Sequence, residues 1–290
     1  MGLFDGKVAV VTGAGGGIGR THALLLAREG AAVVVNDLGG ARDGTGSSTS
    51  MADGVVDEIN AAGGKAIAHY GSVTNKDDAL GMVDAAVNEF GRIDICICNA
   101  GILRDKSFKN MDDEMWDVVM DVHLRGTYLV TKAAYDKMLE LGNGGRIIMT
   151  SSTSGLLGNF GQTNYGAAKA GIAGFMRCLW LEGLKYGVTV NVLAPTATSR
   201  LTEDILPEEI QDRFPPETVS PAIVWLCTDE AKEVTGRQWL VSGNSVSMLS
   251  WQITPIADRD LAEGPWDVEE IGQRILDSKD SWPPINPMRG

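Results

Sequence analysis

The hydrophobic positions along the chain follow two alternating periods, and this pattern predicts strands that alternate with helices. Short apolar runs rich in β-branched residues predict six strands: Lys7–Thr12, Ala31–Asn36, Lys65–Tyr70, Ile93–Cys98, Arg146–Ser151 and Val188–Leu193. Segments with an apolar residue at every third or fourth position predict the helices between them: Gly17–Glu29, Met51–Ala62, Lys76–Phe90, Asp112–Glu140 and Thr163–Tyr186. Because parallel neighbours need a crossover connection, this order predicts a parallel sheet.

The expected fold class is α/β, with a single Rossmann-type, doubly wound parallel sheet and helices on both faces. The strands are apolar along nearly their whole length, as expected when both faces of a sheet are covered. Gly63 and Gly64 follow the second predicted helix and are expected to end it with a left-handed cap.

The pattern becomes weaker after Pro195. It predicts two further helices and a last strand, over Leu201–Phe214, Pro221–Thr228 and Gln238–Val241. Beyond them the chain is rich in proline and reads as irregular, with one helix near Val268–Leu276. We therefore expect one domain over residues 1–250 and a C-terminal extension over residues 251–290.

Composition and charge narrow the class of protein. The chain has 290 residues, of which 44% are hydrophobic and 22% charged, and these are ordinary values for a globular protein. Its longest apolar runs are far shorter than the roughly 20 residues that span a bilayer. The start, MGLFDGKVAVVTG, lacks the features of a signal peptide. These observations predict a soluble, cytoplasmic protein.

The net charge of −13 argues against nucleic acid and anionic membrane surfaces as partners, because both are themselves negative. The chain has four cysteines, Cys96, Cys98, Cys178 and Cys227, and three histidines. Cys96 and Cys98 stand two apart in a strand-like run, which is not a metal-binding arrangement. We expect reduced thiols in the core and no metal site.

The turn after the first strand, from Thr12 to Gly19, carries the first candidate chemistry. Gly13, Gly17, Ile18 and Gly19 stand where a strand passes into a helix, and glycines there let backbone N–H groups approach a pyrophosphate. A merely tight turn is the alternative. The strand before it and the helix after it favour a dinucleotide site.

Two further positions fit the same site. Asp37 ends the second strand, about 20 residues further on, where a carboxylate can accept hydrogen bonds from the ribose hydroxyls of NAD. Asn99, Ala100 and Gly101 end the fourth strand, where small residues let a cofactor lie against the backbone. Each position also has an ordinary interpretation. Asp37 would be a solvated acid in a loop, and Asn99-Ala100-Gly101 would be a turn that ends a strand.

Tyr165 and Lys169 are four residues apart and therefore lie on one face of a helix. A nearby ammonium favours the tyrosinate, so Lys169 is expected to lower the pKa of Tyr165 and make it a general acid or base. Ser152 follows the fifth strand and can hold a substrate oxygen beside the phenol. Taken alone, the spacing favours the ordinary interpretation, an exposed Tyr-Lys pair and a serine that caps or turns, because such spacings recur by chance.

Together, in this order and spacing, these motifs resemble the short-chain dehydrogenase/reductase family from Gly6 to about Gly243. Within it the chain is most similar to the (3R)-hydroxyacyl-CoA dehydrogenases of peroxisomal multifunctional enzyme type 2 and their bacterial single-domain relatives. The closer likeness rests on NDLGG at Asn36–Gly40, NAGILRD at Asn99–Asp105, HLRG at His123–Gly126 and the block MTSSTSGLLGNFGQTNYGAAK.

The resemblance implies an NAD-dependent oxidoreductase with Ser152, Tyr165 and Lys169 as catalytic residues. It also implies a small-molecule substrate, 3-hydroxyacyl-CoA within this branch, and a homodimer or homotetramer. His123 stands where many members have a fourth catalytic residue, an Asn; it either connects Lys169 to water or satisfies a backbone carbonyl within its helix. Pro195 and Thr198 stand where the family contacts the nicotinamide.

The chain departs from the family pattern at several positions. Cys98 replaces an Asn, Ser72 replaces the Asp expected near the adenine, and Thr196 replaces the Gly of a Pro-Gly pair. Other function classes therefore stay open: a steroid or small-alcohol dehydrogenase of the same family, a methyltransferase, and a dinucleotide-binding regulator without catalysis. A methyltransferase and a non-catalytic regulator would not need Tyr165 and Lys169.

Overall fold

The computed structural model describes residues 2–198 and 212–284. One eight-stranded sheet forms its centre, in the order β3-β2-β1-β4-β5-β6-β7-β8. The strands are β1 (Val8–Thr12), β2 (Ala32–Asn36), β3 (Lys65–His69), β4 (Ile95–Cys98), β5 (Gly145–Thr150), β6 (Val188–Thr196), β7 (Gln238–Ser242) and β8 (Ser245–Leu249). The predicted α/β class and doubly wound sheet are confirmed.

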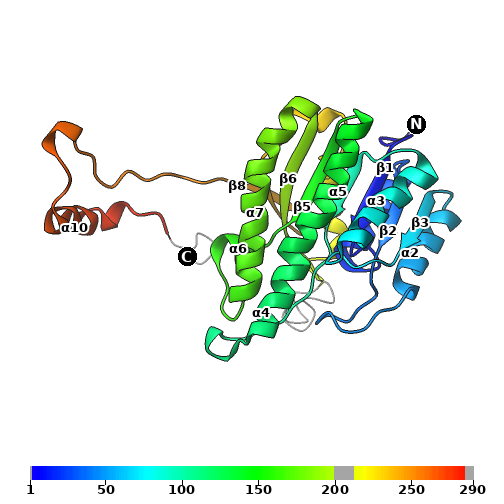
Figure 1. The fold of residues 1–290 in the computed structure, drawn as a ribbon, viewed down its shortest axis with the longest axis horizontal. Coiled ribbons are helices and arrows are strands. Elements are labelled where there is room, and N and C mark those ends of the chain that lie inside the picture. Colours follow the sequence, from blue (N-terminus) through cyan, green and yellow to red (C-terminus); the bar gives the residue numbers. More distant parts are fainter. Residues whose placement is uncertain (1, 199–211, 285–290) are drawn as a thin grey trace. The chain divides into compact units, whose positions relative to one another are not determined.

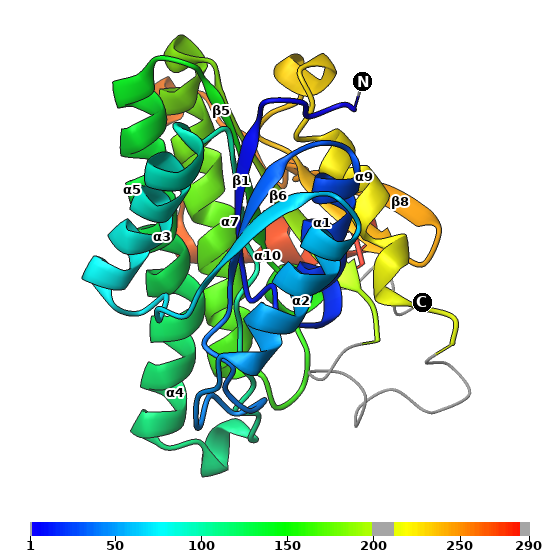
Figure 2. The same cartoon turned by 90° about the vertical axis from the view of Figure 1, so that its right-hand side faces the viewer.

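Helices cover both faces of this sheet, and Figure 2 shows the sheet edge-on between them. The helices of this unit are α1 (Gly17–Arg28), α2 (Ser50–Ala61), α3 (Lys76–Phe90), α4 (Asp113–Met120), α5 (Gly126–Leu141), α6 (Thr153–Leu157), α7 (Thr163–Gly183) and α9 (Ser220–Trp225). One apolar core packs α1, α2 and α9 against the sheet, and a second packs α3, α5 and α7 against its other face.

The ends of these helices follow from local sequence. The Asn75 side chain accepts hydrogen bonds from the N–H groups of Asp77 and Asp78 and so begins α3. Gly91 ends the same helix with a φ of 81°, a conformation that glycine adopts without strain. The left-handed cap expected after α2 is confirmed at Gly63, whose φ is 84°.

The strand order reverses at β1, and this reversal positions the candidate site. β1 pairs on one side with β2, through Val10 and Val34, and on the other with β4, through Val10 and Cys96. The connections from these strands leave in opposite directions, so a crevice opens at their carboxyl ends. The glycine turn, Asp37 and Asn99 follow β1, β2 and β4, so all three lie at this crevice. Figure 1 shows β1 and β2 side by side in the sheet.

Three local predictions were wrong. β8 was not predicted, and it pairs antiparallel with β7, so the sheet is not parallel throughout. A short helix, α6, was not predicted, and the Ser152 hydroxyl begins it by accepting from the N–H of Ser154 at 3.1 Å. Cys178 is exposed rather than in the core, whereas the other three thiols are buried, and all four are free.

The long helical region predicted over Asp112–Glu140 is α4 and α5 joined by a π-helical turn, Asp121–Arg125. One extra residue in such a turn changes the direction in which its side chains project, and π-turns often occur at functional sites. His123 lies at the centre of this turn and is buried. The sequence predicted the helix but not the turn.

The chain divides into two compact units, Met1–Leu249 and Ser250–Gly290. The second contains the helix predicted near its middle, α10 (Val268–Asp277), which Asp267 begins by accepting from the N–H of Glu269. The helix predicted over Leu201–Phe214 falls almost wholly outside the described residues. No helix among the residues described is long and apolar enough to span a membrane.

Candidate active site

The glycine turn lies directly against the end of β4. Gly13 has a φ of 63°, and a Cβ added there would lie 2.8 Å from the Ala100 Cα. A Cβ on Gly19 would collide with the Gly13 carbonyl oxygen. The Asn99 amide donates to the carbonyls of Thr12 and Gly13, both at 3.1 Å. Glycine is therefore required for this close packing, and Asn99 holds the turn in place.

The N-terminus of α1 faces this crevice without a side-chain partner. Its N-cap is Gly16, no side chain caps it, and no acidic residue stands in its first turn. The first N–H groups of a helix have no partner within the helix and attract anions. Gly17 and Ile18 begin α1 and line the pocket. This turn therefore offers the donors that a pyrophosphate would need.

Asp37 is fixed beside the glycine turn. Its Oδ2 accepts from the N–H of Gly15 at 2.8 Å and its Oδ1 from the N–H of Gly39 at 2.7 Å. The side chain is only 7% exposed. Each carboxylate oxygen has further lone pairs, so Asp37 can still accept from two ribose hydroxyls at the pocket wall.

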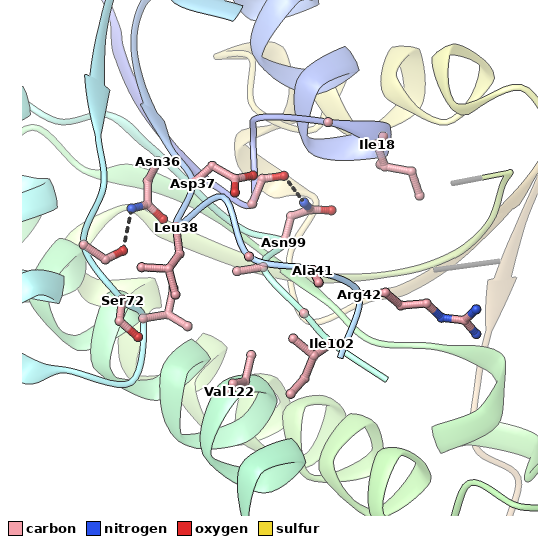
Figure 3. A pocket seen from close by; sticks show the side chains of 18 residues that line it. Ile18, Asn36, Asp37, Leu38, Ala41, Arg42, Ser72, Asn99, Ile102 and Val122 are labelled. Carbon is pink, nitrogen blue, oxygen red and sulfur yellow. Dashed lines mark hydrogen bonds between the residues drawn. The ribbon is translucent and has the colours of Figure 1, made fainter. Parts of the chain in front are cut away.

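A single pocket brings most of the predicted cofactor residues together (Figure 3). Of the predicted set it contains Gly13, Gly17, Ile18, Asp37, Asn99, Ala100 and Gly101. Ser72, where the family has an acid, lines it as well. Gly19 lies behind the turn, and neither Pro195, in β6, nor Thr198, just beyond it, lines this pocket.

Several pocket residues were not predicted from the sequence, and the loop after β2 supplies the most unexpected ones. Ala41 and Arg42 line the pocket because this loop crosses to the segment after β4, where the N–H of Leu103 donates to the Arg42 carbonyl at 3.1 Å. In Figure 3 the Arg42 side chain extends away from Asp37. A glycine-rich loop gives no periodic signal from which this course could be predicted.

The three predicted catalytic residues meet beside this pocket. Tyr165 and Lys169 share a face of α7, with the Lys169 Nζ 5.4 Å from the centre of the Tyr165 ring. The Ser152 hydroxyl lies close enough to the phenol to lower its pKa. Tyr165 also packs against the apolar cluster of Ile102, Val119 and Ala168, of which Ile102 lines the pocket. The alternative of an exposed Tyr-Lys pair is wrong, since Lys169 is 3% exposed.

The expected lowering of the Tyr165 pKa was wrong. Burial, together with a smaller contribution from the charge of Asp105, raises the pKa of Tyr165 to about 12, although the neighbouring Ser152 hydroxyl acts in the opposite direction. Burial also lowers the pKa of Lys169 to about 7. The Lys169 ammonium donates to the Thr150 carbonyl at 2.6 Å, so it does not act on the phenol directly.

One of the two roles predicted for His123 was to satisfy a backbone carbonyl within its own helix. The ring does contact a backbone carbonyl, but this carbonyl belongs to another segment. Its Nε2 lies 2.7 Å from the Ile102 oxygen, and its ring meets the Tyr165 ring edge-on with centroids 5.0 Å apart. The Nδ1 is buried without a hydrogen-bond partner among the described residues. Burial lowers the pKa of His123 well below its ordinary value, so the ring is neutral.

Asn164 is a site residue that the sequence analysis missed. Its side chain is fully buried and donates to the carbonyls of Arg104 and Met115, both at 3.0 Å, while its oxygen accepts from the N–H of Tyr165 at 2.7 Å. These bonds fix the start of α7 against the segment after β4. Its place directly before Tyr165 is the one signal that could have drawn attention to it.

No group of three or more His, Cys, Asp or Glu side chains within residues 2–198 and 212–284 lies close enough together to hold a metal ion. The site brings together a hydroxyl, a phenol and an ammonium group, beside a pocket that offers the uncapped N-terminus of α1 and the fixed carboxylate of Asp37.

Comparison with known proteins agrees with this geometry. A family model described as short chain dehydrogenase matches residues 7–208. Mouse peroxisomal multifunctional enzyme type 2 is 49% identical over 251 residues, which make up 87% of this chain but 34% of that protein. The hydroxyacyl-CoA dehydrogenase ChsB1 of Mycobacterium tuberculosis is 40% identical over 293 aligned positions, with 94% of this chain and 89% of that protein covered.

Solved structures show the same fold. A short chain dehydrogenase from Mycobacterium avium is 42% identical, has a TM-score of 0.86, and is matched over 98% of both chains. A short chain dehydrogenase from Mycobacterium paratuberculosis, solved bound to NAD, is 26% identical with a TM-score of 0.75; the match covers 83% of this chain and 98% of that one. The matched part of this chain thus spans about a third of the mouse protein and nearly the whole of the mycobacterial ones.

Proposed function

Because this chain belongs to the short-chain dehydrogenase family, we propose that it transfers a hydride between NAD and the carbon of a secondary alcohol or ketone, with a 3-hydroxyacyl-CoA as substrate. The observation that carries the proposal is the meeting of Ser152, Tyr165 and Lys169 beside the pocket that contains Asp37. The substrate follows the name of the ChsB1 relative, a hydroxyacyl-CoA dehydrogenase.

Each catalytic residue has a distinct role in this proposal. Tyr165 moves the proton of the substrate oxygen, and Ser152 holds that oxygen through its hydroxyl. Lys169 binds the ribose next to the nicotinamide, and His123 supports Tyr165 by packing against its ring. When bound, the nicotinamide supplies the carbon that accepts or gives the hydride, and its oxidised form brings a positive charge. Pro195 and Thr198 are proposed to contact the same end of the cofactor.

The residues around the pocket fit NAD. The uncapped start of α1 suits the pyrophosphate, and the fixed carboxylate of Asp37 suits two free ribose hydroxyls. A 2′-phosphate at that place would set two negative groups against each other. The cytoplasmic location and the homodimer or homotetramer predicted from the sequence belong to the same proposal.

We expect NAD to be preferred over NADP by at least about tenfold in kcat/KM, a difference of about 1.4 kcal/mol. Asp37→Ser should reduce this preference, chiefly by improving catalysis with NADP, because it removes the repelling carboxylate. Asp57→Ser removes the same charge from an exposed position on α2 and serves as the control. A wild type that prefers NADP would show that Asp37 does not contact the ribose.

A substrate panel tests the second half of the proposal. We expect 3-hydroxyacyl-CoA thioesters to give a higher kcat/KM than steroids or simple secondary alcohols, measured by the absorbance of NADH. If a steroid is oxidised far more efficiently than every thioester, the chain is a steroid dehydrogenase of the same family. If no alcohol is oxidised although NADH binds, the alternative of a non-catalytic dinucleotide-binding regulator is correct.

A further inference from the structure

One end of the cofactor pocket is formed where β2 and β3 end. Residues 71–73 follow β3 and line the pocket together with Asn36, the last residue of β2. In Figure 3 Asn36 and Ser72 lie on the opposite side of the pocket from Ile18, which belongs to the first turn of α1. Because the strand order runs β3-β2-β1, a dinucleotide with its pyrophosphate at α1 and its ribose at Asp37 places its adenine at this end.

The segment after β3 offers an adenine backbone and small side chains, since residues 71–73 are Gly, Ser and Val. The affinity for the base then depends on how firmly this backbone is held in its binding conformation. Two side chains hold it. The N–H of Ser72 donates to the Oδ2 of Asp78, on α3, at 2.8 Å, and the N–H of Gly71 donates to the Nδ1 of His69 at 3.2 Å.

His69, the last residue of β3, connects this segment with the end of β2. Its Nδ1 lies 3.3 Å from the Nδ2 of Asn36 as well as 3.2 Å from the Gly71 nitrogen. Its carbonyl accepts from the N–H of Asp37 at 3.1 Å and from the Asn36 amide at 3.2 Å. The ring packs directly against Gly71, because a Cβ added there would lie 2.6 Å from the His69 Cε1. One residue thus contacts both walls of this end of the pocket.

These contacts require a neutral His69 with its proton on Nε2. A backbone N–H can only donate, so the Nδ1 that faces Gly71 must carry a lone pair, whereas an imidazolium has an N–H at both nitrogens. The ring is half-buried. Burial lowers the pKa of His69 below its ordinary value, although the charge of Asp78 acts in the opposite direction. The form that can accept from Gly71 is therefore the one present at neutral pH.

We propose that His69 is a positioning residue for the adenine end of the dinucleotide: its Nδ1 holds the segment 71–73, and its carbonyl holds Asp37. This inference rests on the proposed function, because it assumes that NAD occupies the pocket. His69 touches no reacting atom, so it acts on the affinity for the cofactor and not on the chemical step.

The experiment measures the dissociation constants of NADH and of ADP-ribose, which keeps the adenine but lacks the nicotinamide. His69→Leu removes the acceptor, so both ligands should bind about tenfold more weakly, equivalent to about 1.4 kcal/mol, while kcat with saturating NAD and 3-hydroxybutyryl-CoA should change little. His69→Asn has the same branched shape as leucine but carries an oxygen at the place of Nδ1. Because asparagine readily accepts from the N–H two residues further on, this variant should bind both ligands like the wild type. Lys65→Leu, at the exposed start of β3, is the control.

Equal affinities in His69→Leu and the wild type overturn the inference. A loss in His69→Asn as large as in His69→Leu overturns it as well, because the ring itself rather than its acceptor would then matter. Should His69→Leu not fold, His69→Val, which also lacks an acceptor and suits a strand, takes its place. A wild type that binds NADH but oxidises no alcohol contradicts the proposed reaction, while the dissociation constants still test His69. A wild type that binds neither ligand contradicts the proposed cofactor and this inference together.

Discussion

Replacing Tyr165 with Phe is expected to lower kcat by about 10²–10⁴-fold, the usual contribution of a general acid or base. The substitution removes one oxygen and keeps the ring, which packs against His123 and the apolar cluster of Ile102, Val119 and Ala168. The dissociation constant for NADH should therefore change little, as measured by fluorescence titration. Tyr128→Phe removes the same atom from an exposed position on α5 and provides the control.

The raised pKa of Tyr165, about 12, adds a pH dependence to this prediction. At ordinary pH the phenol is protonated, which suits it to donate a proton during ketone reduction, whereas alcohol oxidation needs the tyrosinate. We expect the oxidation rate to rise with pH from 7 to 10 and the reduction rate not to rise.

A Tyr165→Phe enzyme that keeps more than about a tenth of the wild-type rate would show that Tyr165 is not the general acid or base.

Replacing Lys169 with Met should also lower kcat/KM by at least about 100-fold, since it removes the group that is proposed to position the nicotinamide ribose beside Tyr165. In contrast to Tyr165→Phe, it should also weaken NADH binding, because Lys169 is proposed to hold the ribose. Unchanged NADH affinity in Lys169→Met would contradict that role. Lys76→Met, at an exposed position on α3, is the matched control.

Lys169 should also make the stability of the fold depend on pH. Its pKa is about 7 in the folded protein, below the ordinary 10.5, because burial disfavours the ammonium. Between these values the unfolded chain binds the proton and the folded protein does not, so the free energy of unfolding rises with pH. From pH 7 to pH 9 the wild type should gain about 2–3 kcal/mol relative to Lys169→Met. Denaturant unfolding at the two pH values measures this; an equal pH dependence in both proteins would contradict it.

The sequence was sufficient for those parts of the fold and site that depend on local patterns. Apolar runs and glycine turns predicted the strands and their order along the chain, and the spacing of Tyr165 and Lys169 predicted that they share a helix face. β8 was missed because Ser245–Leu249 is short and almost wholly exposed at the sheet edge, so no apolar run marks it. The π-turn around His123 was missed because it changes the number of residues per helical turn without changing the type of residue, so the sequence pattern does not show it.

The electrostatics of the site could not be predicted from spacing. The pKa of Tyr165 depends on how deeply α7 is buried and on Asp105, which is 60 positions away in the chain. The direction of the Lys169 ammonium depends on the Thr150 carbonyl at the end of β5. Both contacts form only when the segments after β4 and β5 meet α7, so the sequence identifies the groups but not their charge states.

Hydride transfer itself is tested most directly with an isotope. The wild type is mixed with NAD and 3-hydroxybutyryl-CoA that carries deuterium on the carbinol carbon, and the reduced dinucleotide is analysed by mass spectrometry. We predict that the reduced nicotinamide carries the deuterium and that Tyr165→Phe forms far less of it under the same conditions. Reduced dinucleotide without deuterium, or none from the thioester while NADH still binds, would contradict the proposed reaction.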